Sequence, residues 1–253
     1  MLFQSYYDAS GSESSPENGL TVVGLVASES KWLRFQAAWE AVLQDHGITA
    51  HHMRHFTGSS PKSEFASWKA DDARRARYME ALVKALKQGM HKGFVVTIEP
   101  SALSAVNREV RFGDHGYALA ANLCRRYVER WLVQKHPAAR LQHIFENGDN
   151  GGGILRDLAA FSDVIDGLRF PFSIVEKIRS DGQRVRQFEA ADLVAWETRR
   201  MVIDASIPGR HPRRSLMEIA RMLPLAGTTL TAAKILPICR ERPDLYPPRP
   251  QEG

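Results

Sequence analysis

Cysteine is nearly absent from this sequence. Only Cys124 and Cys239 occur among 253 residues, too few for a zinc site built from thiolates or for a framework of disulfides. No apolar run approaches the roughly 18 residues that a membrane span needs. The N-terminus also lacks the basic, apolar and small-residue pattern of a secretory signal. We therefore expect a cytoplasmic protein with no segment in a membrane.

Net charge is also absent from most of the chain. Residues 1–198 hold 24 Lys and Arg against 24 Asp and Glu, whereas residues 199–253 hold 10 against 5. The C-terminal segment therefore supplies the whole formal charge of +5. A polyanionic partner such as nucleic acid is one interpretation, and solvated surface charge is the alternative. The candidate nucleic-acid contacts are Arg199, Arg200, Arg210, Arg213 and Arg214.

The patterns that are present alternate between strands and helices. Two strand patterns flank a stretch rich in Ser, Gly, Pro and Asn, which favours an antiparallel hairpin. Interleaved elements of both kinds predict an α/β fold, a sheet sandwiched by helices. We expect one domain over residues 1–204 with helical insertions, and a basic, proline-punctuated extension over 205–253 packed on or beside it. Strands are predicted at 2–8, 20–28, 93–98, 141–146 and 170–178, and helices at 32–47, 73–87, 117–134 and 189–203.

Two of the predicted strands end on an acid. Asp8 ends the first strand, and Glu146 ends the strand over 141–146. If these strands are parallel neighbours, both acids face the crevice beyond the carboxyl ends of the strands, where open α/β sheets bind ligands. Adjacent strands lie roughly 4.8 Å apart, so the carboxylates repel unless a cation lies between them. Oxygen ligands without cysteine favour Mg²⁺ or Mn²⁺ over zinc.

Further acids lie in two other segments. Glu189 and Asp192 are three residues apart on a predicted helix, where they share a face. Asp149 lies in the glycine-rich stretch after Glu146, which we interpret as a loop beside the site. Each acid also has a structural interpretation. Asp8 before Ser and Gly suits a turn, Glu146 and Asp149 suit helix caps, and Asp192 suits an ion pair with a nearby Arg.

Three short segments resemble one family. YYDASG is similar to the strand-one motif Y-x-D-E-S-G of the DUF3800 family, EAADLVAW to its late motif Q-x-A-D-L-h-A, and HHMRHF to its histidine-bearing segment. The resemblance implies an integrase-like, ribonuclease H-like mixed sheet flanked by helices, with metal-binding acids at Asp8, Glu146 and Asp192. Ala9 stands where the motif has Glu, which puts full catalytic competence in doubt. Glu189 stands where the motif has Gln, and restores a carboxylate to the site only if the helix points it inward.

Three histidines cluster in the segment that resembles the family's histidine motif. They are His51, His52 and His55. Imidazole binds transition metals, but no H-E-x-x-H motif is present, so a surface or structural role is the first interpretation. In the alternative, His52 belongs to the site and steers the substrate or the leaving group.

These observations predict a metal-dependent phosphodiester hydrolase, a nuclease, acting on DNA or RNA. Asp8 bridges two divalent ions in this hypothesis, and Glu146 and Asp192 each complete one of them. Two alternatives stay open, a non-catalytic ribonuclease H-like module that binds nucleic acid with a degraded metal site, and a hydrolase of another phosphorylated substrate. Mutual repulsion of the acids predicts that Asp8→Asn stabilises the metal-free protein.

Overall fold

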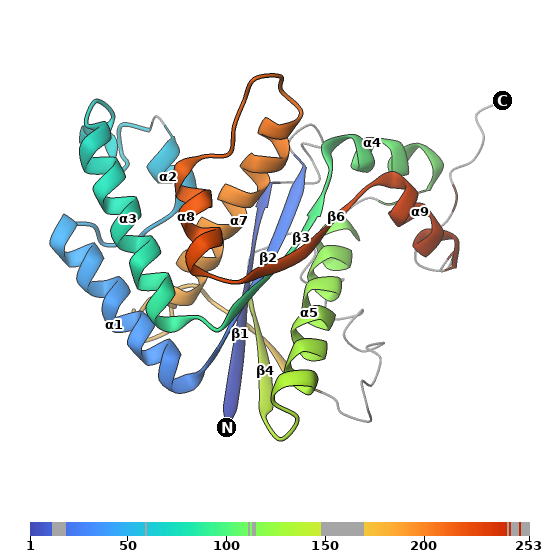
Figure 1. Ribbon diagram of the computed structural model, residues 1–253, viewed down its shortest axis with the longest axis horizontal. Helices are drawn as coiled ribbons and strands as arrows, with labels where there is room; N and C mark the ends of the chain where they lie inside the picture. Colours follow the sequence, from blue (N-terminus) through green and yellow to red (C-terminus); the bar gives the residue numbers. More distant parts are fainter. Residues whose placement is uncertain are drawn as a thin grey trace.

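The protein is an α/β structure in which helices cover both faces of one mixed sheet (Figure 1). This computed structural model describes residues 1–11, 19–58, 60–110, 112, 115–147, 170–241, 243 and 248. In chain order the elements are β1 (Leu2–Gly11), β2 (Leu20–Ser28), α1 (Glu29–His46), α2 (Met53–Thr57), the 3₁₀ helix η2 (Ala66–Trp68), α3 (Asp72–Gly89), β3 (Lys92–Ile98), α4 (Pro100–Glu109), α5 (His115–Lys135), β4 (Arg140–Glu146), β5 (Phe172–Val175), α7 (Arg186–Ala205), α8 (Arg214–Met222), β6 (Leu225–Leu230) and α9 (Ala232–Glu241).

The sheet has the strand order β5-β4-β1-β2-β3-β6. β2 is antiparallel to β1, which confirms the predicted hairpin, and it is also antiparallel to β3. β1 and β4 are parallel neighbours, and their register pairs Phe3 with Leu141 and Tyr7 with Phe145. Asp8 and Glu146 directly follow the last of these pairs, so the prediction that the two acids lie on adjacent parallel strands is confirmed. Glu146 ends β4, but β1 continues to Gly11, and Asp8 pairs with Val23 of β2. The prediction that Asp8 ends its strand, and its interpretation as a turn residue, are therefore wrong.

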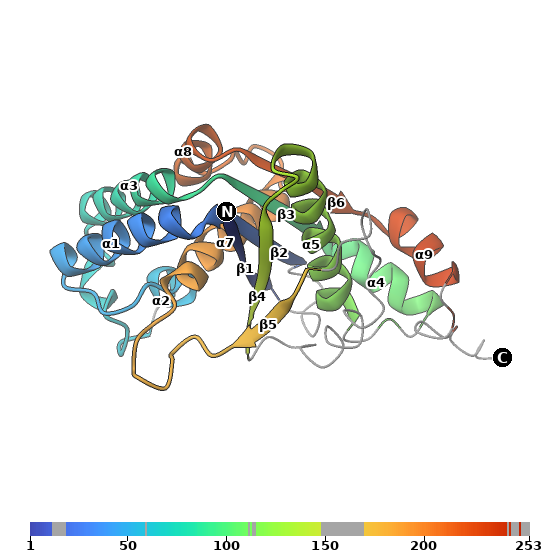
Figure 2. The ribbon, with the colours of Figure 1, turned by 90° about the horizontal axis from the view of Figure 1, so that it is seen from below.

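The alternation of side chains along β1 and β4 decides which helices the acids face. Successive residues of a strand point to opposite faces. Tyr7 and Phe145 pack in the core beneath α4, α5 and α9, whereas Tyr6 and Ile144 pack in the core beneath α1, α3 and α7. Figure 2 shows these two helical layers on either side of the sheet. Asp8 and Glu146 share the parity of Tyr6 and Ile144, and therefore face the layer that contains α7.

The segment after residue 204 is more than a peripheral extension. β6 pairs in parallel with β3 and becomes the edge strand of the sheet, with Leu225 opposite Gly93 and Leu230 opposite Ile98. α8 packs against α3, and α9 against α4. The separate extension predicted for residues 205–253 therefore contributes a strand to the same sheet, because Leu230 and its neighbours complete the edge beside β3. In the described part of the chain, no helix is both long enough and apolar enough to span a membrane.

Candidate active site

A lysine lies between the two strand-ending acids. Lys177 follows β5, the edge strand next to β4. Its Nζ lies 3.1 Å from Glu146 Oε2 and 3.8 Å from Asp8 Oδ2. Asp8 is almost fully buried, and its Oδ1 also accepts a hydrogen bond of 2.7 Å from the Ala9 amide. The cation that the sequence predicts between these carboxylates is therefore, in this structure, an ammonium group of the chain itself.

The pKa of Lys177 is also affected by the negative charge of Asp192. Burial by itself would lower the pKa of the Lys177 ammonium. The negative charges of Asp8, Glu146 and Asp192 together raise this pKa by more than burial lowers it, so the net shift is upward. The ammonium therefore stays charged over the whole physiological pH range. Two carboxylates, from β1 and β4, therefore contact this cation, and the negative charge of Asp192 on α7 acts on it from further away.

Asp192 is held at the N-terminus of α2. Its Oδ2 accepts a hydrogen bond of 2.7 Å from the Met53 amide and lies 3.1 Å from His52 Nδ1. Burial raises the pKa of Asp192, but the bond and the charge of His52, together with the Met53 amide, bring it below its usual value. Asp192 is therefore an ionised carboxylate fixed in place by two donors.

His52 is the histidine that reaches the acids. Its side chain is 39% exposed, and Nδ1 lies close to both Asp192 Oδ2 and the Arg54 amide, the latter at 3.3 Å. A protonated Nδ1 donates to Asp192, whereas a bare Nδ1 accepts from Arg54, so one ring nitrogen serves only one of these partners at a time. In the first state, the carboxylate orients the ring, and Nε2 is the nitrogen left to meet a ligand.

The other two histidines have different surroundings. His51 is buried, its Nδ1 lies 3.1 Å from the Tyr78 hydroxyl, and burial lowers its pKa to about 4. It is a neutral core residue. His55 is exposed, and its ring centroid lies 5.1 Å from that of His52. The structural interpretation therefore holds for His51, and only His52 contacts an acid of the cluster.

Glu189 is buried, but its contacts lie elsewhere. Its carboxylate accepts hydrogen bonds from Trp39 Nε1 at 2.9 Å, from the His51 amide at 3.2 Å and from Arg186 Nη1 at 2.8 Å. Burial raises the pKa of Glu189, and these donors only partly offset that effect. The helix therefore points Glu189 at α1 and at the segment before α2. Because the side chain does not point toward Asp8 and Glu146, Glu189 does not restore a carboxylate to the metal site in this arrangement. Asp149 lies outside the described residues.

Four of the five candidate arginines have partners within the chain. Arg200 and Arg210 both pair with Asp204, at 3.0 and 2.8 Å. Arg213 pairs with Glu197 at 3.3 Å and lies over the ring of Trp196. These acids compete with phosphate for the guanidinium groups, so the basic patch predicted from the charge count is largely neutralised internally. Arg199 Nε donates to Ser10 Oγ at 3.0 Å, and Arg214 lines a hollow between α3 and α8.

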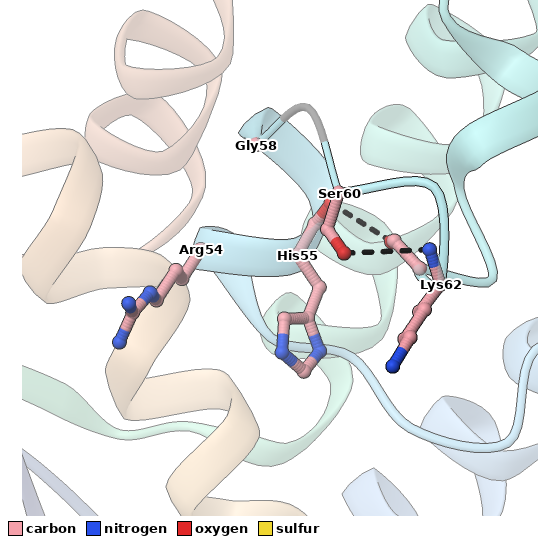
Figure 3. Close-up of a pocket in the computed structure, with 6 residues that line it drawn as sticks. Arg54, His55, Gly58, Ser60 and Lys62 are labelled. Carbon is pink, nitrogen blue, oxygen red and sulfur yellow. Dashed lines mark hydrogen bonds between the residues drawn. The ribbon is translucent and has the colours of Figure 1, made fainter.

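A hollow of about 510 Å³ opens beside α2, on the chain segment that holds Asp192. No acid is among its lining residues (Figure 3), and the side chains of His55 and Lys62 point to the same side in that view. Hydrogen bonds from the Lys62 amide to Ser60 Oγ and from Ser63 Oγ to the His55 carbonyl shape the loop. The hollow presents cations and hydroxyls next to His52. Its lining residues are Arg54, His55, Gly58, Ser60, Lys62 and Ser63.

Lys177 and the basic hollow are the features that sequence reasoning missed. A signal for Lys177 was present, because alternation along the strand predicted over residues 170–178 places it on the same face as Val175, which is opposite Glu146. The observed strand ends at Val175, and Lys177 continues the alternation past that end. No comparable signal marks the hollow, whose lining residues Arg54 and Lys62 come together on its rim only through the fold of the loop.

No known protein provides a reference point for this site: no family model matches the chain, and no curated protein or solved structure is significantly similar to it. The resemblance to the DUF3800 family therefore stays a prediction.

Proposed function

We propose that the protein is a divalent-metal-dependent phosphodiester hydrolase that acts on nucleic acid. The observation that carries the proposal is the pair of carboxylates, Asp8 and Glu146, that two adjacent parallel strands bring to a single cation, with the charge of Asp192 acting on the same cation. The strand order β5-β4-β1-β2-β3, with β2 antiparallel to its neighbours, supports the ribonuclease H-like form of this proposal. A cytoplasmic location is part of it, and is supported by the free thiols of Cys124 and Cys239.

The donor chemistry of the site fits Mg²⁺ or Mn²⁺. Among the residues that the structure describes, no three His, Cys, Asp or Glu side chains are already arranged around one metal position. The Lys177 ammonium, however, already lies between two of the acids, Asp8 and Glu146, in the position where a metal ion would be expected. Carboxylate oxygens are the ligands that both metals prefer. Asp8 and Glu146 would hold the ion, with Asp192 nearby, and the bound ion would supply a Lewis acid that activates water.

The surrounding residues provide the other requirements of hydrolysis. Asp192 orients the His52 ring through Nδ1. Nε2 of the neutral ring would take a proton from the attacking water, and the resulting imidazolium would give that proton to the departing oxygen. The Asp8 carboxylate is held in place by burial, and the Asp192 carboxylate is held by the hydrogen bond from the Met53 amide. Arg54 and Lys62 place positive charge beside His52, where a phosphate backbone would pass.

A non-catalytic nucleic-acid-binding module is the second candidate, and one observation favours it. Lys177 already neutralises the pair Asp8 and Glu146 without a metal. Ala9 also favours the non-catalytic module, because the motif that the chain resembles has Glu at this position. In this alternative, the acids and Lys177 are a permanent ion-pair network that maintains the sheet edge.

A cleavage screen combined with calorimetry decides between the two candidates. The protein is incubated with single-stranded DNA, double-stranded DNA, RNA and an RNA–DNA hybrid, in Mg²⁺, in Mn²⁺ and with chelator. We expect at least one substrate to be cut with metal and none with chelator, and Mn²⁺ to bind in the absence of nucleic acid. Binding of nucleic acid without metal binding or cleavage would instead support the module.

The basic hollow makes a prediction about nucleic-acid binding. Arg54→Ala combined with Lys62→Ala removes two cations beside His52, so we expect weaker binding and a salt dependence flattened by about two units of slope. Fluorescence anisotropy of a labelled oligonucleotide at several salt concentrations measures both effects.

The matched control removes two cations from α9, which packs on the other face of the sheet from α2. Arg240→Ala with Lys234→Ala changes α9, where Arg240 is exposed and pairs with Glu109. This double variant should keep the wild-type slope. If both double variants lowered affinity equally, the hollow would have no specific role and the effect would reflect net charge alone.

A further inference from the structure

Lys177 and a divalent ion would need the same oxygen atoms. The Nζ atom lies 3.1 Å from Glu146 Oε2 and 3.8 Å from Asp8 Oδ2. A divalent ion bound to these carboxylates would lie about 2.0 to 2.6 Å from their oxygens. It would therefore come within a few ångströms of the ammonium, where two cations in a partly buried site repel strongly. The two occupants exclude each other.

We propose that Lys177 is the resident counter-cation of the acidic site, and that its ammonium has to leave Asp8 and Glu146 before a divalent ion binds there. This inference rests on the proposed function, because it concerns the same carboxylates. It adds a residue that controls metal affinity. Lys177 stabilises the metal-free site by compensating the negative charge, and it weakens metal binding by the free energy needed to displace it.

The structure allows the side chain to move while the backbone stays in place. The Lys177 carbonyl accepts a hydrogen bond of 2.9 Å from the Val185 amide, and the next residue, Ile178, forms a β-bridge with Arg184. These contacts fix the main chain after β5. The side chain is 23% exposed and lies at the edge of the sheet, and a lysine has a flexible four-carbon stem. A change of side-chain rotamers therefore takes the ammonium towards solvent without refolding.

Removing the ammonium should raise the affinity for metal. Lys177→Met keeps the length of the stem and deletes the charge, whereas Lys177→Arg keeps a cation between the acids. Mn²⁺ titrations by calorimetry on the full chain should show at least about tenfold tighter binding for Lys177→Met than for wild type, given the coupling usual for close charge pairs. Lys177→Arg should bind no more tightly than wild type.

Two further variants separate this effect from general changes. Lys234→Met removes a lysine at the opposite edge of the sheet, where Nζ donates to the Thr229 carbonyl, and should leave Mn²⁺ affinity unchanged. Lys177→Gln is uncharged but polar, and repeats the test if the methionine variant does not fold as judged by circular dichroism. The gain in affinity is diagnostic, because loss of a merely structural contact would not tighten metal binding.

The remaining outcomes overturn the inference in distinguishable ways. If wild type and the uncharged variants bind Mn²⁺ equally, or the variants bind more weakly, Lys177 does not compete with metal, and the proposed hydrolase is unaffected. If no variant and no wild-type sample binds Mn²⁺, both the inference and the metal-dependent function fail.

Discussion

Replacing Glu129 by alanine is expected to lower the free energy of unfolding by about 3 to 5 kcal/mol, the cost of leaving buried charges without their partner. Glu129 on α5 is 1% exposed and accepts hydrogen bonds from Arg125 Nη1 and from His143 Nε2, the latter at 3.0 Å. Arg125 is buried as well. Without the carboxylate, a guanidinium group and an imidazole N–H lose a shared acceptor inside the protein.

The state of His143 explains why this network is sensitive. Burial lowers the pKa of His143, although Glu129 acts in the opposite direction. The ring is therefore neutral, with Nε2 donating to Glu129, and Nδ1 accepts from the Tyr7 hydroxyl at 2.8 Å. The chain of contacts links α5 to β4 and β1, the strands that carry Glu146 and Asp8. Damage to it should therefore loosen the support of the candidate site.

Urea denaturation of wild type and Glu129→Ala measures the loss. Glu109→Ala is the matched control, because Glu109 also pairs with an arginine, Arg240, at 3.1 Å, but both side chains are largely exposed. Exposed pairs contribute about 0 to 1 kcal/mol, so the control should unfold close to wild type. Equal losses in the two variants would show that the buried network is no more important than a surface ion pair.

Asp8→Asn is expected to abolish the response of the protein to divalent metal. A ligand that binds only the folded state stabilises wild type by about 2.7 kcal/mol at 100 times its dissociation constant. Asp8 is buried beside Lys177 and Glu146, and an amide in its place removes a charged ligand from the proposed metal position. Thermal melts with Mn²⁺ and with chelator should therefore coincide for the variant, and metal-dependent cleavage should be lost.

Asp181→Asn is the control for this variant. Asp181 is exposed, and its Oδ1 accepts a bond of 2.9 Å from the Gln183 amide in the loop after Lys177, a bond that Asn can also accept. Its response to Mn²⁺ should match wild type. If Asp8→Asn retained the full response, Asp8 would not be a metal ligand.

The structure also reverses one expectation about Asp8. Repulsion among the acids alone predicts that Asp8→Asn melts higher than wild type without metal. Lys177 Nζ lies 3.8 Å from Asp8 Oδ2, so the carboxylate has an attractive partner that this reasoning did not include. We now expect the metal-free variant to melt no higher than wild type, in the same melts with chelator.

Much of the site's framework was predictable from local patterns. Apolar alternation located β1 and β4, and the acids that follow the apolar runs, Asp8 and Glu146, lie on these adjacent strands, although β1 continues beyond Asp8 to Gly11. Helical spacing placed Asp192 on α7, beneath which β1 and β2 pack. These predictions succeeded because the period of side chains along a strand or helix is set by the backbone and is visible in any short window.

The partners of the charged groups were not predictable in this way. Glu189 and Asp192 lie three residues apart on one helix, yet Glu189 bonds Trp39 while Asp192 bonds the Met53 amide. Which donor each carboxylate meets depends on how α1 and the segment before α2 pack against α7. Three residues along a helix correspond to a rotation of roughly 300°, about 60° short of a full turn. The two side chains therefore share a face only approximately.

By itself, the sequence determined the alternating elements of an α/β fold, the antiparallel hairpin and the acids carried by two of its strands. Only the tertiary structure decided that Lys177 occupies the space between those acids, 31 residues from Glu146 along the chain, and that β6 closes the sheet edge beside β3. The physical reason is the range of the interactions. Strand and helix patterns come from burial along neighbouring residues, whereas ion pairs and edge pairing depend on which distant segments the completed core brings within a few ångströms.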